Sequence, residues 1–202
     1  MSQPPAPTTL SDRARALFGG VTRRAGSAVH RLGIHPDTIT IVGLIVVAIG
    51  AFFIARGDFQ LGGVLLVLSF PLDALDGAVA RAMNRQDRFG AVLDSTLDRY
   101  ADGLVFGGMA YYFATTDQFD LLLLAMASLM GSFVVSYVRA RAGEADLSVK
   151  IGLFSRFERV IALLIALLIP PLLVPALWVL AIGTNITGVQ RLWYVYLHLD
   201  KQ

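Results

Sequence analysis

Long apolar stretches separated by short polar links fill the chain from residue 36 onward. A helix needs about 20 mainly apolar residues to cross the hydrocarbon core of a membrane. The pattern predicts six such helices, at about 38–56, 60–82, 89–115, 119–142, 155–172 and 174–197. We expect the fifth to be short, because Pro170, Pro171 and Pro175 mark its end. The predicted fold is therefore an all-α integral membrane protein with a six-helix domain over residues 36–199.

The amino-terminal segment has a different pattern. Residues 1–10 are rich in proline and threonine, which predicts a disordered tail. Over residues 11–35, arginines interrupt the apolar positions, so we expect an amphipathic helix that lies in the membrane interface. The alternative is a basic flanking segment that only helps to orient the first membrane helix.

Composition supports the membrane assignment. Hydrophobic residues make up 55% of the chain, charged residues 16%, and the mean hydropathy is +0.64. The absence of cysteine excludes disulfides, thiolate metal sites and a cysteine nucleophile. We expect membrane lipids, and no nucleic acid, around this protein.

Basic residues are concentrated in alternate links between the predicted helices. They precede the first helix, lie between the second and third and between the fourth and fifth, and flank the end of the sixth. The links on the other side contain only Arg56. Because cytoplasmic loops carry the excess of lysine and arginine, we expect both termini on the cytoplasmic side of the cell membrane.

Four aspartates interrupt the second and third predicted helices: Asp73, Asp76, Asp94 and Asp98. Spacings of three and four residues place each pair on one helix face. Acids are costly inside a bilayer, which predicts a cation among them. Carboxylates without histidine or cysteine favour Mg²⁺ or Mn²⁺, and four of them suit two ions that also hold substrate phosphates. The alternative is a buried ion-pair network with Arg81 and Arg99, but two arginines leave an excess of acid.

The spacing Asp-x2-Asp-Gly-x2-Ala-Arg-x8-Gly-x3-Asp-x3-Asp resembles the signature of the CDP-alcohol phosphatidyltransferases. Every fixed position is matched, by Asp73, Asp76, Gly77, Ala80, Arg81, Gly90, Asp94 and Asp98. The six-helix layout with an interfacial helix resembles the family as well. The site lies at the cytoplasmic ends of the predicted helices.

The resemblance implies a reaction in which an alcohol attacks the lipid-bearing phosphorus of CDP-diacylglycerol, or a related CDP-lipid, and CMP leaves. It implies that Asp73, Asp76 and Asp94 hold one divalent ion, and that Asp73, Asp94 and Asp98 hold the other. Asp98 resembles the general base of the family, and members similar to this chain are homodimers. A carboxylate can accept the hydroxyl proton, so no protein nucleophile is required.

Further residues resemble the part of the family site that contacts the CDP-lipid. They are Asp37, Thr38, Ile39 and Thr40 at the start of the first helix, together with Gly77, Ala80, Arg81 and Asp87. Amides and a hydroxyl at a helix amino terminus favour phosphate. The alternative for the first segment is a helix cap at Asp37 or Thr38. For Gly77 the alternative is helix packing, and Asp87 stands where relatives often carry serine or threonine.

A basic group predicts the acceptor alcohol. Ser136, Arg139, Arg156, Arg159 and Arg191 lie at helix ends on the predicted cytoplasmic side. Arginine suits bidentate phosphate contacts. The pattern is similar to that of the phosphatidylinositol phosphate synthases within the family, which implies inositol phosphate as acceptor. The alternatives are a phosphatidylglycerophosphate synthase that uses glycerol-3-phosphate, arginines that only anchor the helices and contact lipid headgroups, and a divalent-cation transporter rather than an enzyme.

Overall fold

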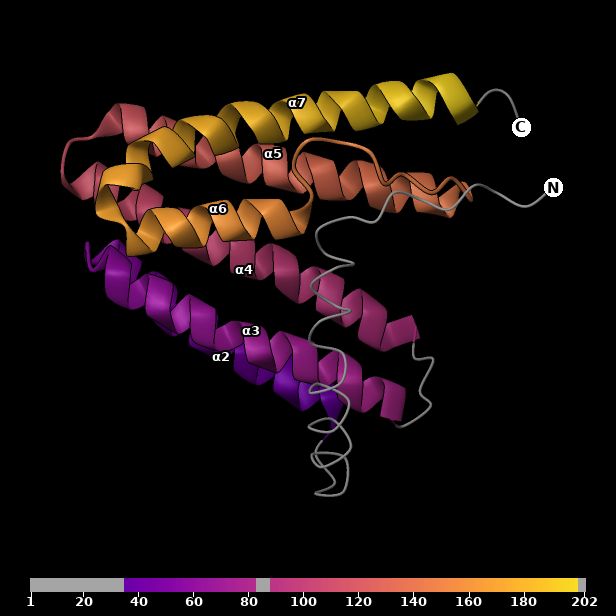
Figure 1. Cartoon of the computed structure of the whole chain (residues 1–202), viewed down its shortest axis with the longest axis horizontal. Helices are drawn as coiled ribbons and strands as arrows, with labels where there is room; N and C mark the ends of the chain where they lie inside the picture. Colours follow the sequence, from indigo (N-terminus) through magenta and orange to yellow (C-terminus); the bar gives the residue numbers. More distant parts are fainter. Residues whose placement is uncertain (1–34, 83–87, 200–202) are drawn as a thin grey trace.

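The chain folds into a bundle of antiparallel helices (Figure 1). The structure is a computed structural model that describes residues 35–82 and 88–199, without the side chains at positions 71, 73–78, 80–82 and 88. Its elements, in order, are α2 (Pro36–Ala55), α3 (Phe59–Ala82), α4 (Arg88–Thr115), α5 (Phe119–Glu144), α6 (Arg156–Leu168), the 3-10 turn η1 (Pro170–Leu172) and α7 (Leu173–Leu199). Each predicted helix is present, and the all-α class is confirmed for the described residues. The tail and interfacial helix expected before α2 lie outside the described residues.

Within residues 35–82 and 88–199, three helical segments are long and apolar enough to cross a membrane: Pro36–Ala55, Phe119–Glu144 and Pro170–Leu199. The helix predicted at 155–172 is shorter than expected, with 13 residues in α6. Ile169 precedes a proline and has an extended ψ of 88°, because the proline ring disfavours a helical conformation in the residue before it. At 1.5 Å per residue α6 measures about 20 Å, less than the hydrocarbon thickness of a bilayer.

Close helix packing fixes the bundle. α2 packs against α3 and α4, α5 against α4 and α7, and α6 against α3 and α7. A Cβ atom on Gly108 would lie 2.6 Å from the carbonyl oxygen of Ala51, so only glycine allows α4 to approach α2 this closely. Between α5 and α7, the Asn185 side-chain amide donates to the Ala127 carbonyl at 3.0 Å. Fully buried Ile54, Met109 and Leu180 lie in the core between these helices.

The antiparallel order gathers the candidate site residues towards one end of the bundle. The amino-terminal ends of α2, α4 and α6 and the carboxy-terminal ends of α3, α5 and α7 point the same way (Figure 1). These ends carry the segments singled out in the sequence, from Asp37 to Arg191, which lie 154 positions apart along the chain. The fold thus brings the predicted acid, nucleotide and acceptor groups to the same part of the molecule.

Candidate functional site

The start of α2 differs from the expected helix cap. The helix begins at Pro36 and its N-cap is His35, whose Nδ1 accepts a hydrogen bond from the Asp37 amide at 3.3 Å. The predicted cap at Asp37 or Thr38 is therefore wrong. Proline fits the first helical position because it lacks the amide hydrogen that would have no partner there. The capping residue thus lies one position before the proline instead of after it.

The segment that follows presents its side chains in different directions. Thr38 is exposed, whereas Ile39 is buried in the bundle. The Thr40 hydroxyl donates to the Pro36 carbonyl at 3.2 Å and lies on the wall of a pocket. Within this segment, Thr40 is the side chain that the structure places in the same pocket as other predicted site residues.

This pocket joins three groups that the sequence suggested separately. Its polar lining comes from Thr40 and Ser69, on α2 and α3, and from Asp98 and Arg156, on α4 and α6. The apolar lining is formed by Gly43, Leu44, Val47, Phe70, Leu97 and Ala101. Its volume is about 60 Å³, below that of the cavities that enclose cofactor-sized ligands. The described residues therefore enclose only a small space, in which Asp98, the predicted base, and Arg156, a predicted acceptor residue, lie together.

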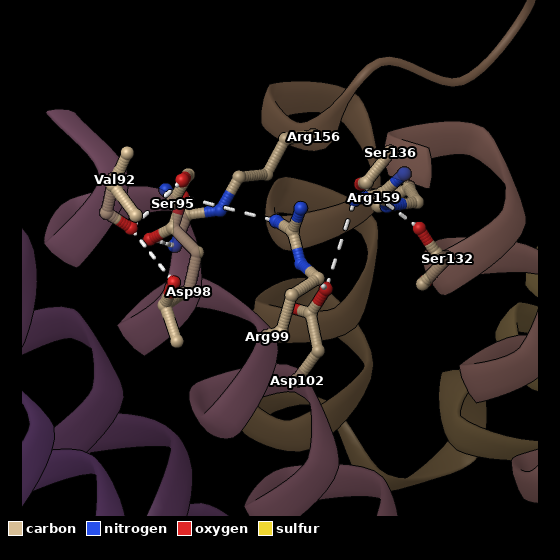
Figure 2. Close-up of polar contacts among 10 residues, drawn as sticks. Val92, Ser95, Asp98, Arg99, Asp102, Ser132, Ser136, Arg156 and Arg159 are labelled. Atoms are coloured by element: carbon tan, nitrogen blue, oxygen red, sulfur yellow. Dashed lines mark hydrogen bonds and ion pairs between the residues drawn. The ribbon is translucent and has the colours of Figure 1, made fainter. Parts of the chain in front are cut away.

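Asp98 lies at the centre of the charged contacts in this corner (Figure 2). Its Oδ1 lies 2.5 Å from Nη2 of Arg156, and its Oδ2 lies 3.8 Å from Nη2 of Arg99. The Asp98 side chain is 14% exposed. The two cations offset the cost of burying its charge. The ion-pair interpretation is thus correct for Asp98 and Arg99, and it is compatible with a metal ion on the same carboxylate.

A second set of charged contacts was missed as part of the site. Asp102 Oδ2 lies 3.9 Å from Nε of Arg99 and 3.7 Å from Nη2 of Arg159. Arg159 is only 4% exposed. The signal was available in the spacing, because Asp98 and Asp102 are four residues apart on α4 and Arg156 and Arg159 are three apart on α6. That spacing predicts two acid–arginine pairs only once α4 and α6 are known to face each other.

The metal group is described only in part. Asp94 is exposed and lies one helical turn before Asp98 on α4. Asp73, Asp76, Gly77, Ala80 and Arg81 lie on α3, a helix as predicted, but their side chains fall outside the described set, and Asp87 falls outside the described residues altogether. Among the side chains that the structure describes, no three carboxylates or histidines gather at one point. The donor chemistry of Asp94 and Asp98, carboxylate oxygens alone, fits Mg²⁺ or Mn²⁺.

The remaining acceptor candidates lie in three different environments. Arg139, near the end of α5, is exposed, and the Ser136 hydroxyl donates to the Ser132 carbonyl at 3.0 Å. Arg191 is 4% exposed and donates from Nε to the Ile151 carbonyl and from Nη1 to the Val135 carbonyl, both at 2.9 Å. Arg191 therefore ties the link between α5 and α6 to α5 and α7.

That link is held close to α7 by two further features. The Phe154 amide donates to the Thr187 hydroxyl at 3.1 Å. Gly152 has a φ of +123°, and a Cβ there would lie 2.4 Å from Cγ2 of Thr187, so a side chain at this position would be strained and would clash. The link leads directly into Arg156, so its fixed path determines where α6 begins.

Comparison with known proteins gives consistent matches. Residues 33–190 match the family described as CDP-alcohol phosphatidyltransferase. The chain is 38% identical over 196 residues to a phosphatidylinositol phosphate synthase of Streptomyces avermitilis, covering 90% of this chain and 80% of the relative. It is 37% identical over 193 residues to a protein of the same name from Mycobacterium marinum, covering 91% of this chain and 82% of the relative.

Solved structures agree with the sequence matches. The crystal structure of Mycobacterium tuberculosis phosphatidylinositol phosphate synthase with CDP-DAG bound has a TM-score of 0.82 and 34% identity, and the match covers 87% of this chain and 94% of that chain. The same enzyme in complex with manganese and citrate also has a TM-score of 0.82 and 34% identity, with 87% and 88% coverage.

Proposed function

The chain belongs to the CDP-alcohol phosphatidyltransferase family, and we propose that it transfers a phosphatidyl group from CDP-diacylglycerol to inositol phosphate. The products are phosphatidylinositol phosphate and CMP. The observation that carries this proposal is the pocket in which Asp98, Arg156 and Thr40 meet. The relatives described above support the substrates, because the two curated ones are named phosphatidylinositol phosphate synthase and a solved one has CDP-DAG bound.

In the proposed reaction, Asp98 is the general base. A hydroxyl oxygen of the acceptor attacks the phosphorus that carries the diacylglycerol, its proton passes to the Asp98 carboxylate, and the bond to the bridging pyrophosphate oxygen breaks to release CMP. Arg156 lies 2.5 Å from Asp98, so an anionic acceptor bound by its guanidinium would have a hydroxyl within reach of the carboxylate. The geometry supports base and acceptor roles on adjacent residues of α4 and α6.

Two divalent ions are proposed to be held by Asp73, Asp76, Asp94 and Asp98. Ions of this kind neutralise pyrophosphate and stabilise the leaving CMP when they are bound. The oxygen-only donor set of Asp94 and Asp98 favours Mg²⁺ or Mn²⁺, and manganese is present in the structure of the Mycobacterium tuberculosis relative.

The CDP-lipid is proposed to contact the start of α2 and the end of α3. This group comprises Asp37, Thr38, Ile39, Thr40, Gly77, Ala80, Arg81 and Asp87. The position of Thr40 in the pocket with Asp98 supports the first part of the group. Buried Ile39 can contribute only through its backbone, whereas exposed Thr38 can offer a hydroxyl to a polar ligand.

The acceptor phosphate is proposed to bind Arg156 directly. Exposed Arg139 and half-buried Ser136 are proposed to line the approach of this phosphate, and the buried Arg159 and Arg191 to add positive charge around it. Acceptors without a phosphate, such as zwitterionic serine or cationic choline, would leave this excess of positive charge unmatched. Glycerol-3-phosphate, also anionic, is the alternative acceptor, and it would make the protein a phosphatidylglycerophosphate synthase.

We further propose that all six helices cross the cell membrane, with both termini and the site on the cytoplasmic side, and that two copies form a homodimer. The three confirmed spans set the direction of the bundle. α3 and α4 are proposed to cross beside them, and the shorter α6 to cross together with the η1 turn that follows it. The distribution of basic links supports this orientation.

An acceptor panel tests the proposal. Purified protein is given CDP-diacylglycerol and Mg²⁺ with inositol phosphate, inositol, glycerol-3-phosphate or serine, and both CMP and the lipid product are identified. We expect CMP release and phosphatidylinositol phosphate with inositol phosphate. Phosphatidylglycerophosphate would establish the alternative acceptor. If CMP release fails with every acceptor but Mn²⁺ uptake into proteoliposomes occurs, the transporter is supported instead.

A further inference from the structure

A second acid–arginine pair lies directly behind the pocket, on the same two helices. Arg156 meets Asp98 at 2.5 Å, and one turn along each helix Arg159 meets Asp102 at 3.7 Å (Figure 2). α6 packs its apolar residues against α3 and α7. The long arginine side chains therefore bridge α6 to α4. The two pairs form one ladder of charge between these helices.

Arg99 connects the two acid–arginine pairs of this ladder. It lies 3.8 Å from Asp98 and 3.9 Å from Asp102, so it is within ion-pair distance of both acids. The described part of the ladder thus contains three arginines and two aspartates. Both Asp98 and Asp102 are largely buried, with side chains 14% and 12% exposed. Within these described contacts, Arg99 is the cation that lies close to both acids.

The contacts of Asp102 are long and open to rearrangement. Distances of 3.7 and 3.9 Å exceed those of hydrogen bonds. Asp102 Oδ2, Arg99 Nε and both Nη atoms of Arg159 are buried and have no hydrogen-bond partner among the described residues. These groups are held by charge rather than by directed hydrogen bonds. If the charge of Asp102 were removed, Arg99 would keep Asp98, 3.8 Å away, as its acid within the ladder.

We infer that Asp102 is a positioning residue, which holds Arg99 and Arg159 and thereby leaves the Asp98 carboxylate to Arg156. Without Asp102, Arg99 moves towards Asp98 and competes with Arg156 for it. The Arg156 guanidinium is then displaced from Asp98 and no longer holds an anionic acceptor next to the base. The inference rests on the proposed function for its kinetic consequence, because it assigns Asp98 and Arg156 the roles given there.

The test uses Asp102→Asn, with Asp120→Asn as a matched control at an exposed position in the first turn of α5. For Asp102→Asn we expect kcat/KM for inositol phosphate to fall about ten- to a hundred-fold, with little change in the KM for CDP-diacylglycerol. Mn²⁺ binding, followed by electron paramagnetic resonance, should weaken roughly five-fold as a second cation approaches Asp98. The control should match wild type in all three measurements.

Suppression by a second substitution separates positioning from a purely structural role. Asp102→Asn combined with Arg99→Gln removes the competing cation. We therefore expect kcat/KM of the double variant to be at least ten-fold higher than that of Asp102→Asn, and its Mn²⁺ affinity to return to that of wild type. In an Arg156→Gln background, Asp102→Asn should add almost nothing, because both changes act on one pair. No recovery in the first combination, or full additivity in the second, overturns the inference.

Two outcomes need to be kept apart. A wild-type protein that neither binds Mn²⁺ nor releases CMP contradicts the proposed function. An active wild type whose Asp102→Asn variant is equally active contradicts the positioning role alone. If Asp102→Asn does not fold, the charge-balanced Asp102→Asn/Arg159→Gln variant replaces it and is compared with Arg159→Gln alone. We expect lower activity in the double variant because Arg99 still competes, and equal activity in the two variants overturns the inference.

Discussion

Arg156 Nη2 lies 2.5 Å from Asp98 Oδ1, although the two residues are 58 positions apart in the sequence and on different helices. The contact joins the residue proposed as general base to the residue proposed to hold the acceptor phosphate. Both line the pocket that Thr40 of α2 also lines. The reacting hydroxyl and the acceptor phosphate are therefore expected to be recognised on adjacent side chains, which links acceptor binding to proton removal.

Asp94→Asn is expected to lose Mn²⁺ binding and to reduce turnover at least about a hundred-fold, because a ligand proposed to contact both ions loses its charge. Titration of purified protein by electron paramagnetic resonance and CMP release at saturating Mg²⁺ measure the two effects. Asp120→Asn, which is exposed near the opposite end of the bundle, serves as the control. Near-normal turnover in Asp94→Asn would contradict the two-ion assignment.

Asp98→Asn is expected to lower kcat by about a hundred- to ten-thousand-fold, the range for loss of a general base. CDP-diacylglycerol binding in the presence of Mn²⁺ should survive better than in Asp94→Asn, because one ion keeps its other proposed ligands. Single-turnover kinetics separate the chemical step from lipid binding. If the variant turns over at the wild-type rate across the pH range, Asp98 is not the base.

Arg191→Ala is expected to lower the free energy of unfolding by about 3 kcal/mol, since it leaves the buried carbonyls of Val135 and Ile151 without their charged donor. The thermal midpoint in detergent should fall by several degrees, and Arg191→Lys should recover part of the loss. Exposed Arg56→Gln is the control. An unchanged midpoint in Arg191→Ala would show that these bonds do not secure the link between α5 and α6.

The helices could be predicted from the sequence more completely than the site. Apolar length determines helices in a membrane, so the six predicted segments lie close to α2–α7. The exceptions are local: Pro170 shortens α6, and Pro36 at the first helical position transfers the cap to His35. The motif located Asp98, but the importance of Asp102 depends on which face of α4 meets α6, and this is a tertiary property.

Arg191 illustrates the same limit. A late arginine on the predicted cytoplasmic side favours a phosphate ligand when it is considered alone. In the structure Arg191 is 4% exposed and bonded to two backbone carbonyls. The reason is that α7 packs against α5 and the 145–155 link lies against Arg191. Sequence spacing could not distinguish an arginine that faces the pocket from one that secures its wall.

The most direct test of this account is the preference for a phosphorylated acceptor in wild type and in Arg156→Gln. The measurement is kcat/KM for inositol phosphate divided by kcat/KM for inositol, with CDP-diacylglycerol and Mg²⁺ saturating. We predict that wild type strongly prefers inositol phosphate and that Arg156→Gln reduces the ratio about ten- to a hundred-fold, the loss of one charged hydrogen-bond partner. An unchanged ratio in a folded, active Arg156→Gln variant would contradict the assignment of acceptor recognition to the Asp98–Arg156 pocket.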